Sequence, residues 1–123
     1  MIGSDFIDSS VWLSYFIDSI NKETIEKEEI LLTSVLSLFE IKKKLLEKNV
    51  PNNEIIEKIN FVKKKSIIIS ITNEIAEESA NICVKNKLPA IDSLIYVSSL
   101  KQNSTLITLD NDFRGLEKVE ILS

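Results

Sequence analysis

Short apolar runs alternate along the chain with longer amphipathic segments, and this alternation constrains the possible folds more than any other feature. The short runs have the length of strands. The middle ones are continuous and rich in branched residues, as expected for strands that are covered on both faces. They lie at residues 6–7, 30–32, 67–69, 105–109 and 119–121. Strands that alternate with helices favour βαβ units, and therefore a mainly parallel sheet.

The segments between these runs carry apolar residues at helical spacing. They lie at about residues 11–20, 34–47, 52–61, 73–83 and 89–100. Asn73 is the candidate N-cap of the fourth helix. No linker, repeat or change of composition divides the 123 residues. We therefore expect an α/β fold with one domain over residues 1–123, in which about five strands form a central sheet with helices on both faces.

The composition excludes several classes of protein and of chemistry. Hydrophobic residues make up 44% and charged residues 28% of the chain, which argues against a disordered protein. No apolar run approaches the ~18 residues of a membrane span, and the N-terminus lacks the features of a signal peptide, so we expect a cytoplasmic protein. The chain has no histidine, which removes imidazole catalysis and histidine-based zinc sites. Its single cysteine, Cys83, is expected to be an inert core thiol.

Four acidic residues fall where a parallel sheet gathers ligands, at the carboxyl ends of its strands. Asp8 follows the first predicted strand and Asp110 ends the fourth. Glu40 interrupts an apolar helical segment, and its side chain leans back toward the start of that helix. Asp92 falls in the first turn of the last helix. We expect these four carboxylates to meet at one end of the sheet, and Asp5 to lie at the opposite end.

Each of these acids also has a purely structural interpretation. Asp8 could be the N-cap of the first helix, and Asp110 could be a turn residue. Asp92 could be a first-turn residue whose negative charge the helix dipole stabilises. Taken singly, the three aspartates favour this interpretation. Glu40 is different, because a carboxylate on an apolar face needs a partner, which a lysine from residues 42–44 could supply. It is the convergence of all four that favours a functional site.

Four carboxylates in one cleft repel one another, so they must take up cations or protons. Oxygen ligands without histidine or cysteine favour hard ions, Mg²⁺ or Mn²⁺. Two such ions about 4 Å apart can hold a phosphodiester, generate hydroxide from water and stabilise the leaving oxygen. The net charge of −4 is unlike that of most nucleic-acid-binding proteins, but four site acids account for all of it.

Four segments resemble, in order, the motifs of PIN-domain ribonucleases. They are FIDSSV (residues 6–11), SVLSLFEI (34–41), LPAIDSLI (88–95) and TLITLDNDF (105–113). The first resembles the opening Asp-Thr-Ser-Val motif, the second an apolar helix with one Glu, the third Leu-Pro-x-x-Asp-x-x-Ile, and the last Thr-x-Asp-x-Asp-Phe. Together they cover nearly the whole chain, and a single domain of this size looks most like a VapC-type toxin.

The resemblance implies a metal-dependent endoribonuclease on a PIN-like fold. It further implies a homodimer that acts on RNA and is inhibited by a small antitoxin protein, its partner in a type II toxin–antitoxin pair. By position, the family's catalytic and metal-binding acids correspond to Asp8, Glu40, Asp92 and Asp110. We expect metal-activated water to leave a 5′-phosphate and a 3′-hydroxyl.

Further residues take accessory places in the same motifs. They are Ser10, which the resemblance gives a role in orienting a ligand or phosphate, Thr108, and Asp112 beside the last acid. Arg114 is a weaker candidate for a contact with RNA phosphate. The lysine runs at residues 42–44 and 63–65 are interpreted first as solvated surface and second as a surface that follows the RNA backbone.

Two other functions stay open on the sequence alone. A phosphoacceptor domain would also gather acids beyond its strand ends, but it would need a lysine at the end of a late strand, where this chain has Asp110. A PIN-like interaction domain without catalysis would have the same fold. The presence of all four acids gives no sign that catalysis has been lost.

Overall fold

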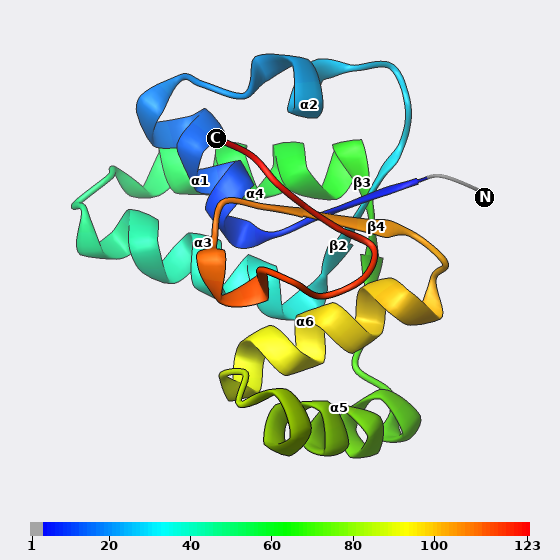
Figure 1. Cartoon of the computed structure of the whole chain (residues 1–123). Coiled ribbons are helices and arrows are strands. Elements are labelled where there is room, and N and C mark those ends of the chain that lie inside the picture. The colour runs from blue at the N-terminus through cyan, green and yellow to red at the C-terminus, as the bar shows by residue number, and fades with distance from the viewer. Residues whose placement is uncertain (1–3) are drawn as a thin grey trace.

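The computed structural model describes residues 4–123 and contains a five-stranded sheet (Figure 1). Its strands are β1 (Asp5–Ile7), β2 (Leu31–Ser34), β3 (Ser66–Ile69), β4 (Thr105–Thr108) and β5 (Val119–Ile121). Their order across the sheet is β3-β2-β1-β4-β5, and every neighbouring pair is parallel. The predicted α/β architecture is confirmed, with a sheet that is entirely parallel.

Helices cover both faces of this sheet (Figure 1). They are α1 (Ser9–Asp18), α2 (Lys22–Glu26), α3 (Val35–Glu47), α4 (Asn52–Lys65), α5 (Asn73–Asn86) and α6 (Ala90–Lys101), and a 3₁₀ turn, η1 (Asn111–Phe113), follows β4. Helices α1, α3 and α4 pack on one face, whereas α6 packs on the other and carries α5 on its outer side. Within residues 4–123, none of the helices has the length and apolar character needed to cross a membrane.

The alternation of side chains along the strands builds a separate core on each face. Ile7 and Ile107 pack in the core with α1, α3 and α4. Phe6 and Leu106, one residue earlier in the same strands, pack in the core with α6. Since successive strand residues point to opposite faces, a strand with a core on both sides must be apolar throughout. This is why the central strands have continuous apolar runs instead of an alternating pattern.

Strand β3 departs from the expectation that the middle strands are covered on both faces. It lies at the edge of the sheet, and Ile67 is 50% exposed. Ile30, which was expected to begin the second strand, lies before β2 and is 52% exposed. The expectation was correct for β2, which is buried along its whole length between β1 and β3. A run of branched residues therefore does not distinguish a central strand from an edge strand.

The starts of two helices are fixed by hydroxyl caps. The Ser34 hydroxyl accepts a hydrogen bond from the Leu36 amide at 3.1 Å and caps α3. The prediction that Asn73 caps α5 was wrong, because Thr72 occupies the cap position with an extended backbone. The Thr72 hydroxyl accepts from the Ile75 amide at 3.1 Å, and Asn73 is the first residue inside the helix.

Two residues noted in the sequence lie away from the carboxyl ends of the strands. Asp5 begins β1 opposite the first residue of β4, and its carboxylate pairs with the Lys27 ammonium. The prediction that Asp5 lies at the amino end of the sheet is confirmed. Cys83 is half-buried on α5, where its thiol donates to the Leu88 carbonyl at 3.1 Å, so the expectation of a core position was wrong.

Aromatic packing anchors helix α1 on the sheet. Trp12 is fully buried, and its indole N–H donates to the Thr33 hydroxyl at 3.2 Å. Its ring stacks on Phe16 with 6.1 Å between centroids and meets the edge of Phe61 from α4 at 6.3 Å. Because Asp8 directly precedes α1, this packing also fixes where Asp8 emerges from the sheet.

Substitution of Ile41 tests the core between α1, α3 and α4. Ile41 is fully buried in this core, so Ile41→Ala should lower the free energy of unfolding by about 2–5 kcal/mol. Ile56→Ala on α4 removes the same atoms from a side chain that is 56% exposed, and it should change this free energy by less than about 0.5 kcal/mol. Urea unfolding measures both values. Equal losses in the two variants would contradict the described packing.

Candidate active site

The parallel register of β1 and β4 places two acids at the same edge of the sheet. Ile7 is paired with Ile107 at the carboxyl ends of these neighbouring strands. Asp8 follows β1, and its amide donates to the Ile107 carbonyl at 3.0 Å. Asp110 follows β4 by two residues. Both aspartates therefore lie at the carboxyl edge, where they were predicted.

The carboxylate of Asp8 is held by two hydroxyl groups. Asp8 is only 5% exposed, and its Oδ2 accepts from Ser10 Oγ at 2.7 Å and from Thr108 Oγ1 at 2.8 Å. The two hydroxyl oxygens also lie 3.3 Å from each other, where either hydroxyl can donate to the other. Asp8 occupies the N-cap position of α1, as the structural interpretation expected, although its side chain makes no capping hydrogen bond.

The same two hydroxyls also fix the end of β4. Ser10 Oγ accepts from the Leu109 amide at 3.0 Å, and Thr108 Oγ1 accepts from the Asp110 amide at 3.0 Å. The hydrogen bonds of Ser10 and Thr108 thus connect the Asp8 carboxylate to the backbone that carries Asp110. Burial raises the pKa of Asp8, and the hydrogen bonds from the two hydroxyls oppose this shift.

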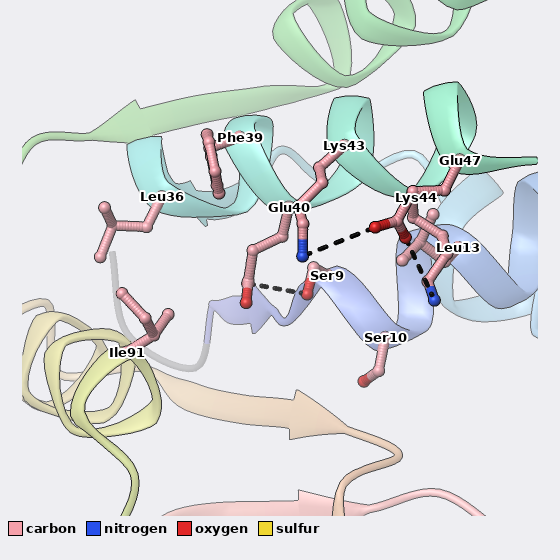
Figure 2. A pocket seen from close by; sticks show the side chains of 10 residues that line it. All are labelled: Ser9, Ser10, Leu13, Leu36, Phe39, Glu40, Lys43, Lys44, Glu47 and Ile91. Carbon is pink, nitrogen blue, oxygen red and sulfur yellow. Dashed lines mark hydrogen bonds and ion pairs between the residues drawn. The ribbon is translucent and has the colours of Figure 1, made fainter.

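Glu40 on α3 is held by a hydroxyl from α1. The Ser9 hydroxyl donates to Glu40 Oε1 at 3.0 Å (Figure 2). Of the lysines considered as partners for Glu40, Lys43 and Lys44 form their ion pairs with Glu47, each at 3.7 Å. Ser9 was not among the predicted site residues. Its only signal in the sequence is its place directly after Asp8, since the contact with Glu40 depends on how α1 packs on α3.

The hydrogen bond from Ser9, the residue after Asp8, holds the Glu40 carboxylate at the start of α1. The pKa of Glu40 is raised, first by burial. The hydrogen bond from Ser9 lowers this pKa, the negative charges of Asp8 and Asp110 raise it, and the positive charge of Lys43 lowers it. Glu40 therefore faces the aspartate-lined edge of the sheet, as its position in the helix predicted.

Two further carboxylates, those of Asp92 and Asp112, converge on Asp110. Oxygens of Asp92, Asp110 and Asp112 lie within 4.8 Å of one another. Asp92 is in the first turn of α6, as predicted. Asp110 caps η1, since its Oδ1 accepts from the Asp112 amide at 2.9 Å, so it is both a turn residue and a member of the cluster. Asp112 lies in this turn, whose last residue, Phe113, is fully buried in the core with α6.

Burial together with nearby negative charge raises the pKa of Asp92 from its ordinary value of 3.8 to about 7. Burial is the largest cause, followed by the charges of Asp110 and Asp8. A hydrogen bond with Asp110 and the charge of Asp112 add to the shift. Asp92 is therefore protonated at mildly acidic pH unless a cation binds to the cluster.

A pocket of about 420 Å³ opens beside Glu40, between α1 and α3 (Figure 2). Its lining includes polar residues such as Ser9 and Glu40 and apolar residues such as Leu13 and Phe39. Phe39 is 67% exposed. The acidic site thus opens onto a surface with a marked apolar component.

Arg114 lies on the surface beside η1. Its guanidinium donates to Asn111 Oδ1 at 2.7 Å in an exposed position. This local partner agrees with an ordinary surface arginine. A contact with RNA phosphate stays a prediction.

The donor set fits a hard divalent cation. The carboxylates are all oxygen ligands, and three of them present oxygens within 4.8 Å of one another. The chain has no histidine. The raised pKa values of Asp8, Glu40 and Asp92 reflect burial, and for Glu40 and Asp92 also negative charge that a cation would offset. Oxygen-only sites of this kind suit Mg²⁺ or Mn²⁺.

A family model of the PIN domain matches residues 6–119. The chain belongs to the PIN domain family. The match includes the five acids of the site, Asp8, Glu40, Asp92, Asp110 and Asp112. A search of curated proteins finds no match.

Solved structures of toxins have the same fold as this PIN domain. A toxin–antitoxin complex from Klebsiella pneumoniae is 21% identical with a TM-score of 0.79, over 95% of this chain and 96% of that chain. The sarcin–ricin loop cleaving toxin VapC20 from Mycobacterium tuberculosis is 16% identical with a TM-score of 0.77, over 98% and 100%. VapBC2 from Rickettsia felis, bound to a promoter DNA fragment, is 17% identical with a TM-score of 0.73, over 99% and 98%. At these identities the likeness establishes the fold.

The raised pKa of Asp92 predicts how the stability of the metal-free protein changes with pH. In the unfolded chain an aspartate ionises near pH 3.8, whereas Asp92 in the folded protein ionises near pH 7. The folded state therefore binds this proton more tightly, and its stabilising contribution is complete below about pH 4 and disappears as the pH rises through about 7. Urea unfolding in EDTA between pH 5 and 8 should show stability falling with pH.

Asp92→Asn should flatten this decline, because the side chain no longer titrates. Asp18→Asn, at an exposed aspartate that ends α1, should leave the fall of stability with pH unchanged. The same slope in wild type and Asp92→Asn would contradict the described electrostatics.

Proposed function

We propose that this PIN domain is a divalent-metal-dependent endoribonuclease and the toxin of a type II toxin–antitoxin pair. The observation that supports this most is the convergence of acids from four separate segments at one edge of the sheet. The proposed catalytic and metal-binding residues are Asp8, Glu40, Asp92 and Asp110. The electrostatic coupling of Glu40 and Asp92 to the other two supports treating them as one site.

A bound Mg²⁺ or Mn²⁺ would supply Lewis acidity toward a phosphodiester and an acidified water for its hydrolysis. The protein's own contribution is to hold oxygen ligands in place. Asp92, with a pKa of about 7, can release its proton near neutral pH when a cation enters. Asp112, whose carboxylate lies beside those of Asp92 and Asp110, is proposed as an accessory acid.

Ser10 and Thr108 are proposed to position Asp8 rather than to bind RNA. Both donate their hydroxyl hydrogens to Asp8 Oδ2, and both accept a backbone amide from the end of β4. Both hydroxyls are thus engaged inside the protein, with Asp8 and with each other. Their role is thus to hold the Asp8 carboxylate in one orientation at the edge of the sheet.

The proposed partners rest on the family and on the similar structures. Structures from Klebsiella pneumoniae and Rickettsia felis contain toxin–antitoxin pairs, and VapC20 cleaves the sarcin–ricin loop. By likeness, we propose a small antitoxin protein as the partner of this chain and RNA as its substrate. A homodimer and a cytoplasmic location belong to the same proposal.

Removal of a single site acid tests the proposed activity. Asp8→Asn and Asp92→Asn should each reduce Mn²⁺-dependent RNA cleavage by more than roughly 100-fold. Loss of a residue that only orients a metal ligand typically costs roughly 10–100-fold, and loss of a ligand should cost more. Circular dichroism should show the fold intact, and Asp18→Asn should cleave like the wild type. Unchanged cleavage in both site variants would refute the proposal.

The ends of the RNA products test the reaction type. Hydrolysis by an activated water leaves a 5′-phosphate and a 3′-hydroxyl, and EDTA should abolish it. Labelling of the product ends, with and without prior phosphatase treatment, distinguishes these termini. A 2′,3′-cyclic phosphate would mean that the RNA's own 2′-hydroxyl is the nucleophile, and the proposed reaction would then be wrong.

A further inference from the structure

The Glu40 side chain reaches the site from the surface of α3 and needs a contact that holds it there. Its carboxylate is part-buried and accepts from the Ser9 hydroxyl at 3.0 Å. Lys43, the cation whose charge acts on Glu40, forms its ion pair with Glu47 at 3.7 Å (Figure 2). A glutamate has three rotatable side-chain bonds, so without a fixed donor its carboxylate can adopt other orientations.

Ser9 is well placed to be that donor, because its own position is fixed. It is buried and is the first residue of α1. The preceding residue, Asp8, donates its amide to the Ile107 carbonyl at 3.0 Å and accepts the Val11 amide at 3.0 Å through its carbonyl. The hydroxyl of Ser9 is therefore attached to a backbone that hydrogen bonds hold on both sides, where β1 leads into α1.

One residue thus links two acids that come from different parts of the chain. Ser9 follows Asp8 directly, and its side chain binds a carboxylate 31 residues further on. We propose that Ser9 is a positioning residue that fixes the Glu40 carboxylate relative to Asp8 and thereby strengthens divalent-cation binding. This inference rests on the proposed function, in which Glu40 is a metal ligand.

A double-mutant cycle tests whether Ser9 acts through Glu40. Calorimetric titration of the full chain with Mn²⁺ gives the dissociation constants of wild type, Ser9→Ala, Glu40→Gln and the double variant. Loss of a partner that orients a ligand costs about 10–100-fold in metal affinity, so Ser9→Ala should bind Mn²⁺ at least tenfold more weakly. In the Glu40→Gln background, Ser9→Ala should have no further effect, because the two residues act as one unit.

Matched variants separate the hydroxyl from packing. Ser9→Thr keeps the hydroxyl donor and should bind Mn²⁺ like the wild type. Ser9→Val introduces a side chain with the shape of threonine but no donor, and its Mn²⁺ affinity should match that of Ser9→Ala. If Ser9→Ala does not fold, the comparison of Ser9→Thr with Ser9→Val gives the same test. Ser14→Ala removes another buried hydroxyl from α1, one that donates to the Val11 carbonyl, and should leave Mn²⁺ binding unchanged.

The outcomes distinguish this inference from the proposed function. If Glu40→Gln binds Mn²⁺ as tightly as the wild type, Glu40 is not a ligand and the proposed function fails at this residue, together with the inference. If Glu40→Gln weakens binding but Ser9→Ala does not, the inference alone is overturned. An equal effect of Ser9→Ala in both backgrounds would also overturn it, because Ser9 would then act independently of Glu40.

Discussion

Electrostatic repulsion among carboxylates at the carboxyl edge of the sheet is the constraint on which the site depends. Asp92 carries the clearest sign of it, a pKa of about 7 caused by burial and by the charges of Asp110, Asp8 and Asp112. Such repulsion would push flexible segments apart. The site can persist only because the segments that carry its acids are held by the rest of the fold.

The hydrophobic cores supply that restraint on both faces of the sheet. Trp12 anchors the helix that follows Asp8, and Ile41 anchors the helix that carries Glu40. On the other face, Phe113 holds the turn that follows Asp110, and Ile95 holds the helix that begins near Asp92. Each acid is thus within a few residues of a fully buried side chain, which accounts for how a 123-residue chain holds them together.

Much of the fold and four of the acids could be predicted because their signals are local. A strand that ends in an acid, followed by a helical pattern, identifies Asp8 without any knowledge of the remaining chain. By contrast, α2 was not predicted, since it has five residues and begins after Asn21, which has a φ of 60° and gives no capping hydrogen bond. The exposed position of Ile67 also could not be predicted, because the sequence of one strand does not determine its place in the order of strands across the sheet.

The site details that sequence could not supply are those that depend on packing between elements. The Ser9 contact with Glu40 requires the observed approach of α1 to α3, and the place of Asp112 beside Asp92 requires the turn at η1. Conversely, the structural and functional interpretations of Asp110 were not exclusive. Its carboxylate caps the turn and joins the cluster at the same time.

The most direct test of the account is anomalous diffraction from crystals of the protein grown with Mn²⁺. The account predicts an anomalous peak at the carboxyl edge of the sheet, within coordination distance of carboxylates from at least three of the four segments that carry Asp8, Glu40, Asp92 and Asp110. Absence of a peak there at saturating Mn²⁺, with these acids in their described places, would contradict it.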